Sequence, residues 1–398
     1  MPDIAFADLP AVANHLRSVV GQKIQNNPNK SPFVLIYAFN GTGKTRLSGA
    51  YRDLGRAVNA DGEITKRDTL YFNAYTEDLF AWDNDLKHER EPVLELNEDS
   101  KFFDGLRELE LEVKIGQLLA RYSDLNFRID YDRRAPAPPP ETKETLLAPA
   151  VIFFRERDAD GNPIPIKVSR AEENIFIWCF FLVILQLALD GDPAYTWVEH
   201  VYIDDPISSL DEHNAIVVGN HLVQLYRDAN RAIPTVVSTH HTLFFNTLHY
   251  ELKSHIGRPV QYALKQDRGT NGYVLREQQG DTPQFYHVSA LADLCELARQ
   301  GTANTYHFNV LRSILEKTAF FLGYGHFGSC LKKDANDSEG ILHQRFVDIL
   351  SHGKYSMYEP TEMGEQTREY FLTILKGFVD RHPFNPDLVK DLPETKKS

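Results

Sequence analysis

The sequence predicts an α/β domain followed by a mostly helical domain. Two observations predict the first domain: the apolar run Phe33–Tyr37 leads directly into a glycine-rich loop, and a second apolar run at residues 201–204 ends in paired aspartates. A third observation predicts the second domain, because from about Leu291 the apolar residues recur at helical spacing. The change from strand-rich to helix-rich sequence falls near residues 265–290, and we assign residues 1–264 to the first domain and residues 265–398 to the second.

The composition limits the class of protein. With 398 residues, of which 42% are hydrophobic, the chain can form two domains with substantial cores. The longest apolar run, residues 175–185, is short for a bilayer span and is typical of a buried core helix. The three widely spaced cysteines indicate neither a disulfide framework nor a zinc site, and the N-terminus lacks the pattern of a secretory signal. We therefore expect a cytoplasmic protein with no membrane partner.

The chain is acidic, with a formal net charge of −13. Residues 1–264 carry about −11 of this charge and residues 265–398 about −2. Nonspecific binding to nucleic acid depends on cations that neutralise phosphates. The charge therefore argues against a broad basic surface, but it leaves room for a small positive pocket in the second domain.

The first domain carries an insertion, and the second is a succession of helices. Residues 134–141 are the clear low-complexity segment, and their prolines favour an extended chain. Helical spacing precedes this segment at residues 104–122, and a hairpin is predicted after it around the turn at residues 158–162. In the second domain we expect helices at residues 291–299, 306–322, 340–350 and 367–379.

Residues 38–45 read Ala-Phe-Asn-Gly-Thr-Gly-Lys-Thr, a phosphate-binding loop with alanine where the first glycine usually lies. Such a loop holds phosphates through consecutive backbone N–H groups and a helix N-terminus. The glycines allow the tight curl, the lysine reaches the terminal phosphates, and the threonine hydroxyl binds Mg²⁺. The predicted nucleotide-binding residues of the loop are Asn40, Gly41, Thr42, Gly43, Lys44, Thr45 and Arg46.

A second motif supplies carboxylates. Asp204 ends a hydrophobic strand and should hold Mg²⁺. Asp205 follows on the opposite side of the strand, where a catalytic carboxylate can activate water, and Asp211 continues the motif as a nucleotide-binding residue. A lone histidine is more often structural, but His240 ends a further buried strand and is placed to contact a γ-phosphate. The neighbouring His241 is the weaker candidate.

This order of motifs is typical of ABC-type ATPases, which also need a signature segment supplied across a dimer. Residues 168–172, Val-Ser-Arg-Ala-Glu, resemble a degenerate signature at the start of the apolar helix. Ser169 and Glu172 are therefore candidate nucleotide-binding residues. Ser169 would also serve as an ordinary helix N-cap, and the two roles are compatible. Glu77 is our hypothesis for the position of the Gln loop.

Four segments resemble the anticodon nuclease family typified by PrrC and related to RloC. They are residues 35–48, 73–85, 203–211 and 306–324, and the resemblance covers almost the whole chain. It implies a bacterial antiphage-defence ribonuclease in which an ABC-type ATPase is joined to a helical nuclease that cuts tRNA-Lys in the anticodon loop. It further implies Mg²⁺ with GTP or ATP at the nucleotide site, dTTP as an effector, and silencing by a type I restriction-modification complex.

Arg312 and Glu316 are four residues apart, so one face of a helix carries both. From the spacing alone, an exposed salt bridge is the simpler interpretation. The resemblance implies instead a catalytic triad that works without metal, completed by His352. Glu316 would take the proton from the 2′-OH and His352 would give one to the leaving oxygen, although these two roles could be exchanged. Arg312 would stabilise the phosphate, and His326 and His343 compete with His352 for the third place.

The resemblance also implies that residues 278–285 recognise the anticodon, with Asp281 pairing with a basic substituent of the wobble base. Gln278 and Gln279 replace the Lys-Tyr of the family pattern, and a surface turn is the alternative interpretation.

For the whole chain we predict a nucleotide-regulated tRNA anticodon nuclease that leaves 2′,3′-cyclic phosphate and 5′-OH ends. Its ATPase parts should pair, which predicts a homodimer or a higher even oligomer. One alternative is a DNA-sensing or repair ATPase of the ABC type without a nuclease of its own. Another alternative is an effector that cuts DNA.

Overall fold

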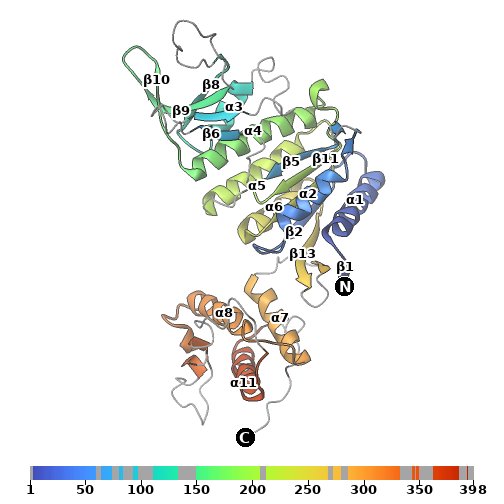
Figure 1. The fold of residues 1–398 in the computed structure, drawn as a ribbon, viewed down its shortest axis with the longest axis vertical. Coiled ribbons are helices and arrows are strands. Elements are labelled where there is room, and N and C mark those ends of the chain that lie inside the picture. The colour runs from blue at the N-terminus through green and yellow to red at the C-terminus, as the bar shows by residue number, and fades with distance from the viewer. Residues whose placement is uncertain are drawn as a thin grey trace. The chain divides into compact units, whose positions relative to one another are not determined.

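The structure is a computed structural model, and the chain divides into two compact units, Met1–Asp281 and Thr282–Ser398 (Figure 1). The predicted fold class is confirmed, because an α/β unit built around a phosphate-binding loop precedes a unit whose described elements are mostly helical. The structure describes residues 3–59, 64–73, 80–83, 93–96, 111–132, 149–206, 212–267, 272–278, 286–331, 343–345, 347–348, 362–384 and 392.

The boundary between the units follows Asp281, within the stretch 265–290 where the pattern changes but after the assigned limit at residues 264 and 265. That position falls inside β13 (Val260–Asp267), which pairs in parallel with β2 (Phe33–Tyr37) and antiparallel with β14 (Gly272–Glu277). Residues 265–281 therefore belong to the first unit. The change to helical spacing marks where the helices begin, but it does not reveal that a last hairpin still belongs to the sheet.

A seven-stranded sheet forms the centre of the first unit, in the order β1-β14-β13-β2-β12-β11-β5. Its central strands are parallel, and only the β14 and β1 side is antiparallel. The bounds of the remaining strands are Ile4–Phe6 for β1, Thr69–Asn73 for β5, His200–Asp204 for β11 and Thr235–Thr239 for β12. Because β12 lies between β2 and β11, the carboxyl ends of these three strands meet at one edge of the sheet.

Helices cover both faces of this sheet (Figure 1). Alternate residues of β2 point to opposite faces: Val34 and Ile36 join one core, while Phe33 and Leu35 join the other. The first core contains α1 (Leu9–Asn26) and α2 (Lys44–Asp53). The second contains residues of α4 (Arg170–Asp190), α5 (Glu212–Arg227) and α6 (Thr242–His255). Burial on both faces explains why the strands read as continuous apolar runs.

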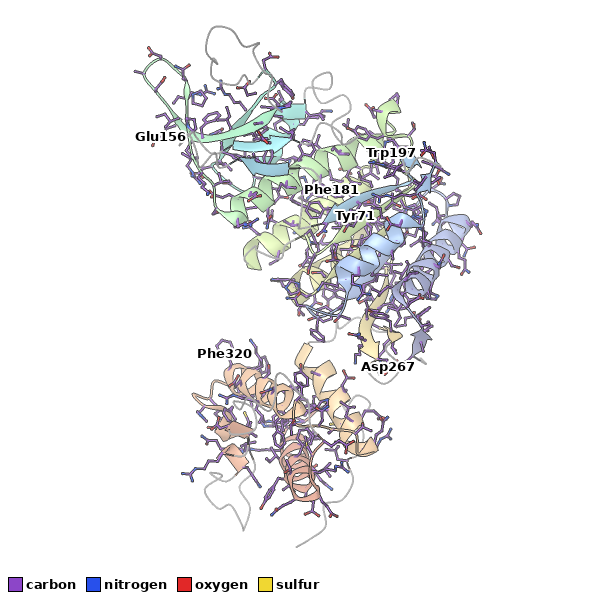
Figure 2. All side chains as sticks on the ribbon, in the orientation of Figure 1. Tyr71, Glu156, Phe181, Trp197, Asp267 and Phe320 are labelled. Atoms are coloured by element: carbon purple, nitrogen blue, oxygen red, sulfur yellow. The ribbon has the colours of Figure 1, made fainter. Side chains whose placement is uncertain are left out.

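The apolar helix α4 is a core helix. By length and hydropathy it could cross a membrane, but 83% of its apolar window is buried inside the protein. Phe181 illustrates this, since its ring packs against Phe72 of β5 with centroids 5.0 Å apart (Figure 2). Ser169 caps the start of the helix, and Gly191 ends it with a positive φ of 84°. The expectation of a buried helix at residues 175–185 is confirmed.

A second sheet flanks α4 and forms a small lobe. The predicted hairpin is confirmed by β9 (Ala150–Arg157) and β10 (Pro163–Pro165). The helix α3 (Leu111–Leu119) lies within the predicted helix 104–122, whereas residues 101–110 and 134–141 lie outside the described residues. The other small elements are β3 (Ala57–Val58), β4 (Ile64–Lys66), β6 (Phe80–Asp83), β7 (Val93–Leu96), β8 (Asn126–Asp130) and η3 (Pro193–Tyr195).

The second unit has a core of its own, in which Phe308 meets Phe371 edge to face at 5.0 Å. The expected helices at 291–299, 306–322 and 367–379 are confirmed, and part of the expected helix 340–350 is described as helical at residues 343–345 and 347–348. The described elements of the unit are α7 (Tyr286–Gln300), α8 (His307–Phe321), η4 (Phe327–Cys330) and α11 (Glu365–Arg381).

Candidate functional site

The phosphate-binding loop curls around its own lysine. Gly41 and Gly43 have φ values of 82° and 103°, a conformation that glycine adopts without steric cost. Lys44 is the first residue of α2 and is only 6% exposed. Its Nζ donates to the carbonyl oxygens of Ala38 and Phe39 at 3.1 and 3.2 Å. The loop thus holds a buried positive charge at the N-terminus of a helix.

Asn40 provides a further acceptor for Lys44, with its Oδ1 3.1 Å from Nζ. Thr45 and Arg46 follow on the first turn of α2 with exposed side chains, and Thr42 is partly exposed. A Cβ atom added at Gly41 would meet no heavy atom within 4 Å, so the space over the loop is open. The predicted loop residues are therefore arranged beside open space, where a phosphate can approach the backbone of the loop.

Asp205 and His240 meet Lys44 across neighbouring strand ends. The Nδ1 atom of His240 lies 2.8 and 2.7 Å from the two carboxylate oxygens of Asp205. Lys44 Nζ lies 3.3 Å from Asp205 Oδ2. Asp205 also has a positive φ of 50°, which is uncommon for a residue with a side chain. The structure therefore brings three of the predicted residues into one contact group.

Asp204 faces a different set of partners. Its Oδ1 accepts a hydrogen bond of 2.6 Å from Ser238, and its Oδ2 lies 3.5 Å from the hydroxyl of Ser48. The hydroxyl of Thr45 also donates to it. Asp204 is 1% exposed. Carboxylate and hydroxyl oxygens are the ligands that Mg²⁺ prefers, so Thr45 and Asp204 fit such an ion.

The two neighbouring carboxyl groups have opposite pKa shifts. Burial raises the pKa of Asp204, and the hydrogen bonds from Ser238 and Thr45 only partly oppose that effect. Burial would also raise the pKa of Asp205, but the hydrogen bond from His240 and the charge of Lys44 outweigh it and lower the pKa. Asp205 is therefore ionised at neutral pH and can accept a proton or orient a water molecule.

His241 has a structural role. Its Nδ1 accepts a hydrogen bond from the backbone of Phe244 and caps the start of α6. Ser48, Ser238 and Thr239 are site residues that the sequence analysis missed, and Thr239 donates to Asp205 at 3.0 Å. Their position at the end of a strand next to His240, or one turn into α2, was the signal that could have identified them.

Ser169 and Glu172 form a reciprocal capping box at the start of α4. The backbone N–H and the hydroxyl of Ser169 lie 2.8 and 2.7 Å from Glu172 Oε2. Arg155 bonds to the same glutamate and to Asp124. Burial alone would raise the pKa of Glu172, but Ser169 and Arg155 lower it. Ser169 is exposed, so the helix start that the signature role needs is at the surface of the first unit.

Four predicted residues lie outside the described residues. They are Glu77, Asp211, Asp281 and His352. Their roles stay predictions.

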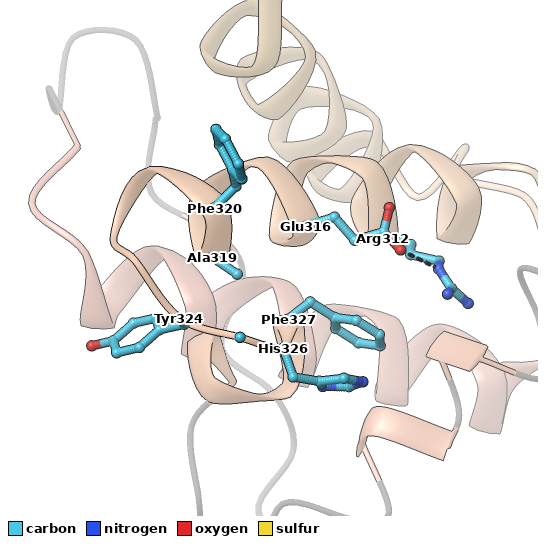
Figure 3. A pocket seen from close by; sticks show the side chains of 8 residues that line it. Arg312, Glu316, Ala319, Phe320, Tyr324, His326 and Phe327 are labelled. Atoms are coloured by element: carbon cyan, nitrogen blue, oxygen red, sulfur yellow. Dashed lines mark hydrogen bonds and ion pairs between the residues drawn. The ribbon is translucent and has the colours of Figure 1, made fainter.

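In the second unit, Arg312 and Glu316 line a pocket of about 330 Å³ beside α8 (Figure 3). Arg312 Nε donates to Glu316 Oε1 at 2.8 Å, so the salt bridge expected from the spacing exists. The guanidinium also donates through Nη1 to Asp348 at 2.8 Å. It lies 5.3 Å from the ring centroid of Phe327, within the range of a cation–π contact. Arg312 is thus held on three sides.

His326 lines the same pocket, whereas His343 is buried. The backbone N–H of Gly328 donates to His326 Nδ1 at 3.0 Å, so the neutral ring carries its proton on Nε2. Its ring stacks on Phe327 with centroids 4.7 Å apart. Sequence reasoning named His326 as a competitor but missed Asp348. The position of Asp348 on the predicted helix 340–350, four residues before His352, was the available signal.

A relative from Escherichia coli described as "Anticodon nuclease" is 32% identical over 371 residues, which cover 86% of this chain and 88% of that protein. No protein-family model matches the chain. Among solved structures, an SMC head bound to the C-winged helix domain of ScpA aligns with a TM-score of 0.32 at 10% identity, over 62% of this chain and 91% of that one. An SMC head domain from Thermotoga maritima aligns with a TM-score of 0.26 at 12% identity, over 63% and 91%.

Proposed function

This chain belongs to the anticodon nuclease family, and on that premise we propose that it is a nucleotide-regulated endoribonuclease that cuts tRNA in the anticodon loop. The proposed cleavage needs no metal at the nuclease site and leaves 2′,3′-cyclic phosphate and 5′-OH ends. The observation that carries the proposal is the Arg312–Glu316 pair in the wall of a pocket. A cation can stabilise the negative charge on a phosphate, and a carboxylate beside it can accept the proton of a neighbouring hydroxyl group.

The proposed reaction is a transfer within the RNA. Glu316 accepts the proton of the 2′-OH, and the 2′-oxygen forms a bond to phosphorus. The bond from phosphorus to the 5′-oxygen breaks, and His352 gives that oxygen a proton. Arg312 stabilises the negative charge on the phosphate through its planar set of N–H donors. His326 is the alternative acid, because it lines the pocket that Arg312 and Glu316 share.

Asp348 has a positioning role in this proposal. It binds the Nη1 side of the guanidinium while Glu316 binds Nε, so the plane of Arg312 is fixed before the substrate arrives. A group fixed in this way loses less entropy when the phosphate binds. This supports Arg312 as the stabilising group, since an unconstrained surface arginine would have to be ordered by the substrate.

The first unit is proposed to be an ABC-type engine that hydrolyses GTP or ATP. Lys44 would contact the terminal phosphates, Thr45 and Asp204 would hold Mg²⁺, and Asp205 would orient the attacking water with His240 close by. When bound, Mg²⁺ supplies charge neutralisation at the phosphates. Ser169 would complete the site of a second copy, so the working form is a homodimer or a higher even oligomer.

The finer parts of the proposal concern substrate and control. We propose tRNA-Lys as the substrate, with Asp281 recognising a basic wobble-base substituent. We also propose dTTP as an effector, a type I restriction-modification complex as the silencing partner, and antiphage defence in the cytoplasm as the setting. The family membership supports the choice of tRNA as a class of substrate, while Gln278 makes the preference among tRNAs a matter for experiment.

The test uses the full chain. The protein is first incubated with GTP and Mg²⁺, and total tRNA is then added together with EDTA, so that cleavage proceeds in the presence of the chelator. Sequencing and mass spectrometry of the fragments should find cuts in the anticodon loop with cyclic phosphate ends. A tRNA with a 2′-deoxy sugar at the cut site should be inert, because the nucleophile is missing. A 5′-phosphate product would contradict the proposed chemistry.

Arg312→Ala, Glu316→Ala and His352→Ala should each abolish cleavage but leave nucleotide hydrolysis intact. The double variants should be little worse than the single ones, because the groups act on one transition state. The matched control is the exposed Arg299–Glu296 salt bridge of α7, whose alanine variants should cleave normally. If His326→Ala abolishes cleavage and His352→Ala does not, His326 is the acid. Intact hydrolysis with no RNA cleavage by the wild type would favour the DNA-sensing ATPase.

A further inference from the structure

The C-terminal end of α8 exposes aromatic side chains next to the nuclease pocket. Phe320 is 85% exposed and Phe321 is 86% exposed. Tyr324, just beyond the helix, is also exposed, and Phe320 projects away from the body of its unit (Figure 2). An exposed phenylalanine forgoes the stabilisation that burial would give, so a cluster of such residues marks a surface that binds something.

The backbone that carries these rings is fixed at the end of α8. Gly323 has a φ of 75° and ends the helix, because its N–H donates to Phe320 O and the N–H of Tyr324 donates to Ala319 O at 2.8 Å. This pair of hydrogen bonds is a Schellman motif, in which the residue after the glycine folds back over the last turn. Tyr324 and Ala319 accordingly line the same pocket. The backbone that carries Phe320 and Tyr324 is therefore ordered before any ligand arrives.

The pocket has a charged end and an aromatic end. Figure 3 shows the guanidinium of Arg312 at one end and Tyr324 at the other, while the ring of Phe320 projects from α8 on the side opposite Phe327 and His326. Both aromatic residues are part of the pocket lining, whereas Phe321 is not. A volume of about 330 Å³ suits one small ligand rather than a duplex. A nucleotide has the matching form, with a charged phosphate at one end and a flat base at the other.

Charge considerations favour RNA bases as the occupant of the aromatic end. The second unit carries a net charge of about −2, so contacts with phosphates supply little affinity. Stacking of unpaired bases on aromatic side chains does not depend on positive charge, and it is how proteins commonly hold single-stranded RNA.

We propose that Phe320 and Tyr324 form a stacking platform for unpaired bases of the RNA, next to the phosphate held at Arg312. This inference rests on the proposed function and adds a binding element to it. The platform selects a single-stranded loop over a helix, because a base within a duplex cannot present its face to the rings.

The test compares neighbouring phenylalanines in the full-length protein. The RNA is an anticodon stem-loop with a 2′-deoxy sugar at the cut site, carrying 2-aminopurine at one loop position at a time. Phe320→Leu and Tyr324→Leu should weaken binding about tenfold or more, and the stacking-dependent change of 2-aminopurine fluorescence should disappear. With cleavable RNA, KM should rise while kcat changes little, since stacking holds the bound base before and during the reaction. Phe320→Trp should restore both properties.

Phe321→Leu is the matched control, because it changes an equally exposed phenylalanine outside the pocket and should leave binding unchanged. Wild-type binding by Phe320→Leu and Tyr324→Leu, with intact cleavage, would overturn the platform and leave the proposed function standing. If Phe320→Leu and Phe321→Leu instead alter the sedimentation of the protein and not its RNA affinity, the aromatic cluster joins two copies of this chain. A wild-type protein that neither binds nor cuts the stem-loop would overturn the proposed function itself.

Discussion

The imidazole of His240 lies 2.7 Å from the carboxylate of Asp205, although the two residues are 35 positions apart in the sequence. The parallel pairing of β11 and β12 places the ends of the two strands side by side. The positive φ of Asp205 then turns the chain as it leaves β11, and the backbone N–H of His240 also donates to Asp205. This contact joins the predicted water-activating carboxylate to the predicted γ-phosphate sensor.

The first prediction concerns this carboxylate. Asp205→Asn keeps the shape of the side chain but removes the charge that accepts a proton, so nucleotide hydrolysis should fall about 10²- to 10⁴-fold. Nucleotide binding should persist, because Lys44 and the loop are unchanged, and closed dimers should accumulate. Phosphate release and light scattering measure the two effects. Asp228→Asn, a change at a surface carboxylate of the same unit, should behave as wild type. Normal turnover in Asp205→Asn would remove this residue from the mechanism.

The second prediction concerns the orientation of Arg312. Asp348→Ala removes the acceptor of the Nη1 hydrogen bond, so kcat for RNA cleavage should fall about 10- to 100-fold. Asp348→Asn should restore part of the loss, because the amide oxygen still accepts this bond. KM should change little, since the residue positions the stabilising group rather than binding RNA. Asp380→Ala, at an exposed aspartate of α11, is the control. Equal activity of all three variants would limit Asp348 to an ordinary surface salt bridge.

The third prediction concerns substrate choice. Asp281→Ala should weaken cleavage of the preferred tRNA by about 1–3 kcal/mol, the value of a lost charge-assisted hydrogen bond. Unstructured RNA and other tRNAs should lose little, because they lack the basic wobble substituent. Ratios of kcat/KM between these substrates measure the effect. A uniform loss on all substrates would make Asp281 a structural residue.

The fourth prediction concerns the acid stability of the first unit. Burial, together with the neighbouring charge of Arg121, lowers the pKa of His221 from 6.5 to about 4. Its Nδ1 lies 2.8 Å from the hydroxyl of Tyr122, an arrangement that suits the neutral ring. In the unfolded chain the ring takes up a proton below pH 6.5. The contribution of the buried neutral ring to the free energy of unfolding is therefore fully present above that pH and is lost as the pH falls towards 4. Discounted for the remaining solvent exposure, the lowered pKa corresponds to about 2 kcal/mol of stability.

Urea unfolding at a series of pH values checks this, with tryptophan fluorescence as the signal, since all three tryptophans lie in the first unit. His221→Gln should be less stable than wild type at pH 7.5 but should lose less stability between pH 6.5 and 4.5. His255→Gln, a change at an exposed histidine of α6, should follow the wild-type curve. If the free energy of unfolding falls equally with pH in His221→Gln and in wild type, protonation of His221 does not cause the loss of stability in acid.

Local motifs could be predicted from the sequence because their structure depends on neighbouring residues. The strand, loop and helix around Lys44, the N-cap at Ser169 and the hairpin at residues 158–162 are all specified within a few positions. The all-round apolar character of α4 likewise predicted its burial. The boundary between the units lies within the stretch 265–290 where the pattern changes, but after the assigned limit at residue 264, because a final antiparallel hairpin carries no signal that distinguishes it from the start of a new domain.

The sequence by itself determined that this chain has a phosphate-binding loop, paired aspartates at a strand end and an Arg-Glu pair on one helical face. Only the tertiary structure decided which distant groups complete them. Strand order brings His240 to Asp205, and packing in the second unit brings Asp348 to Arg312. The tertiary structure also decided the exposure of Phe320, which is as apolar as its buried neighbours on α8 but is exposed beside the pocket. Contacts between residues far apart depend on how elements pack, and spacing along the chain carries no record of that packing.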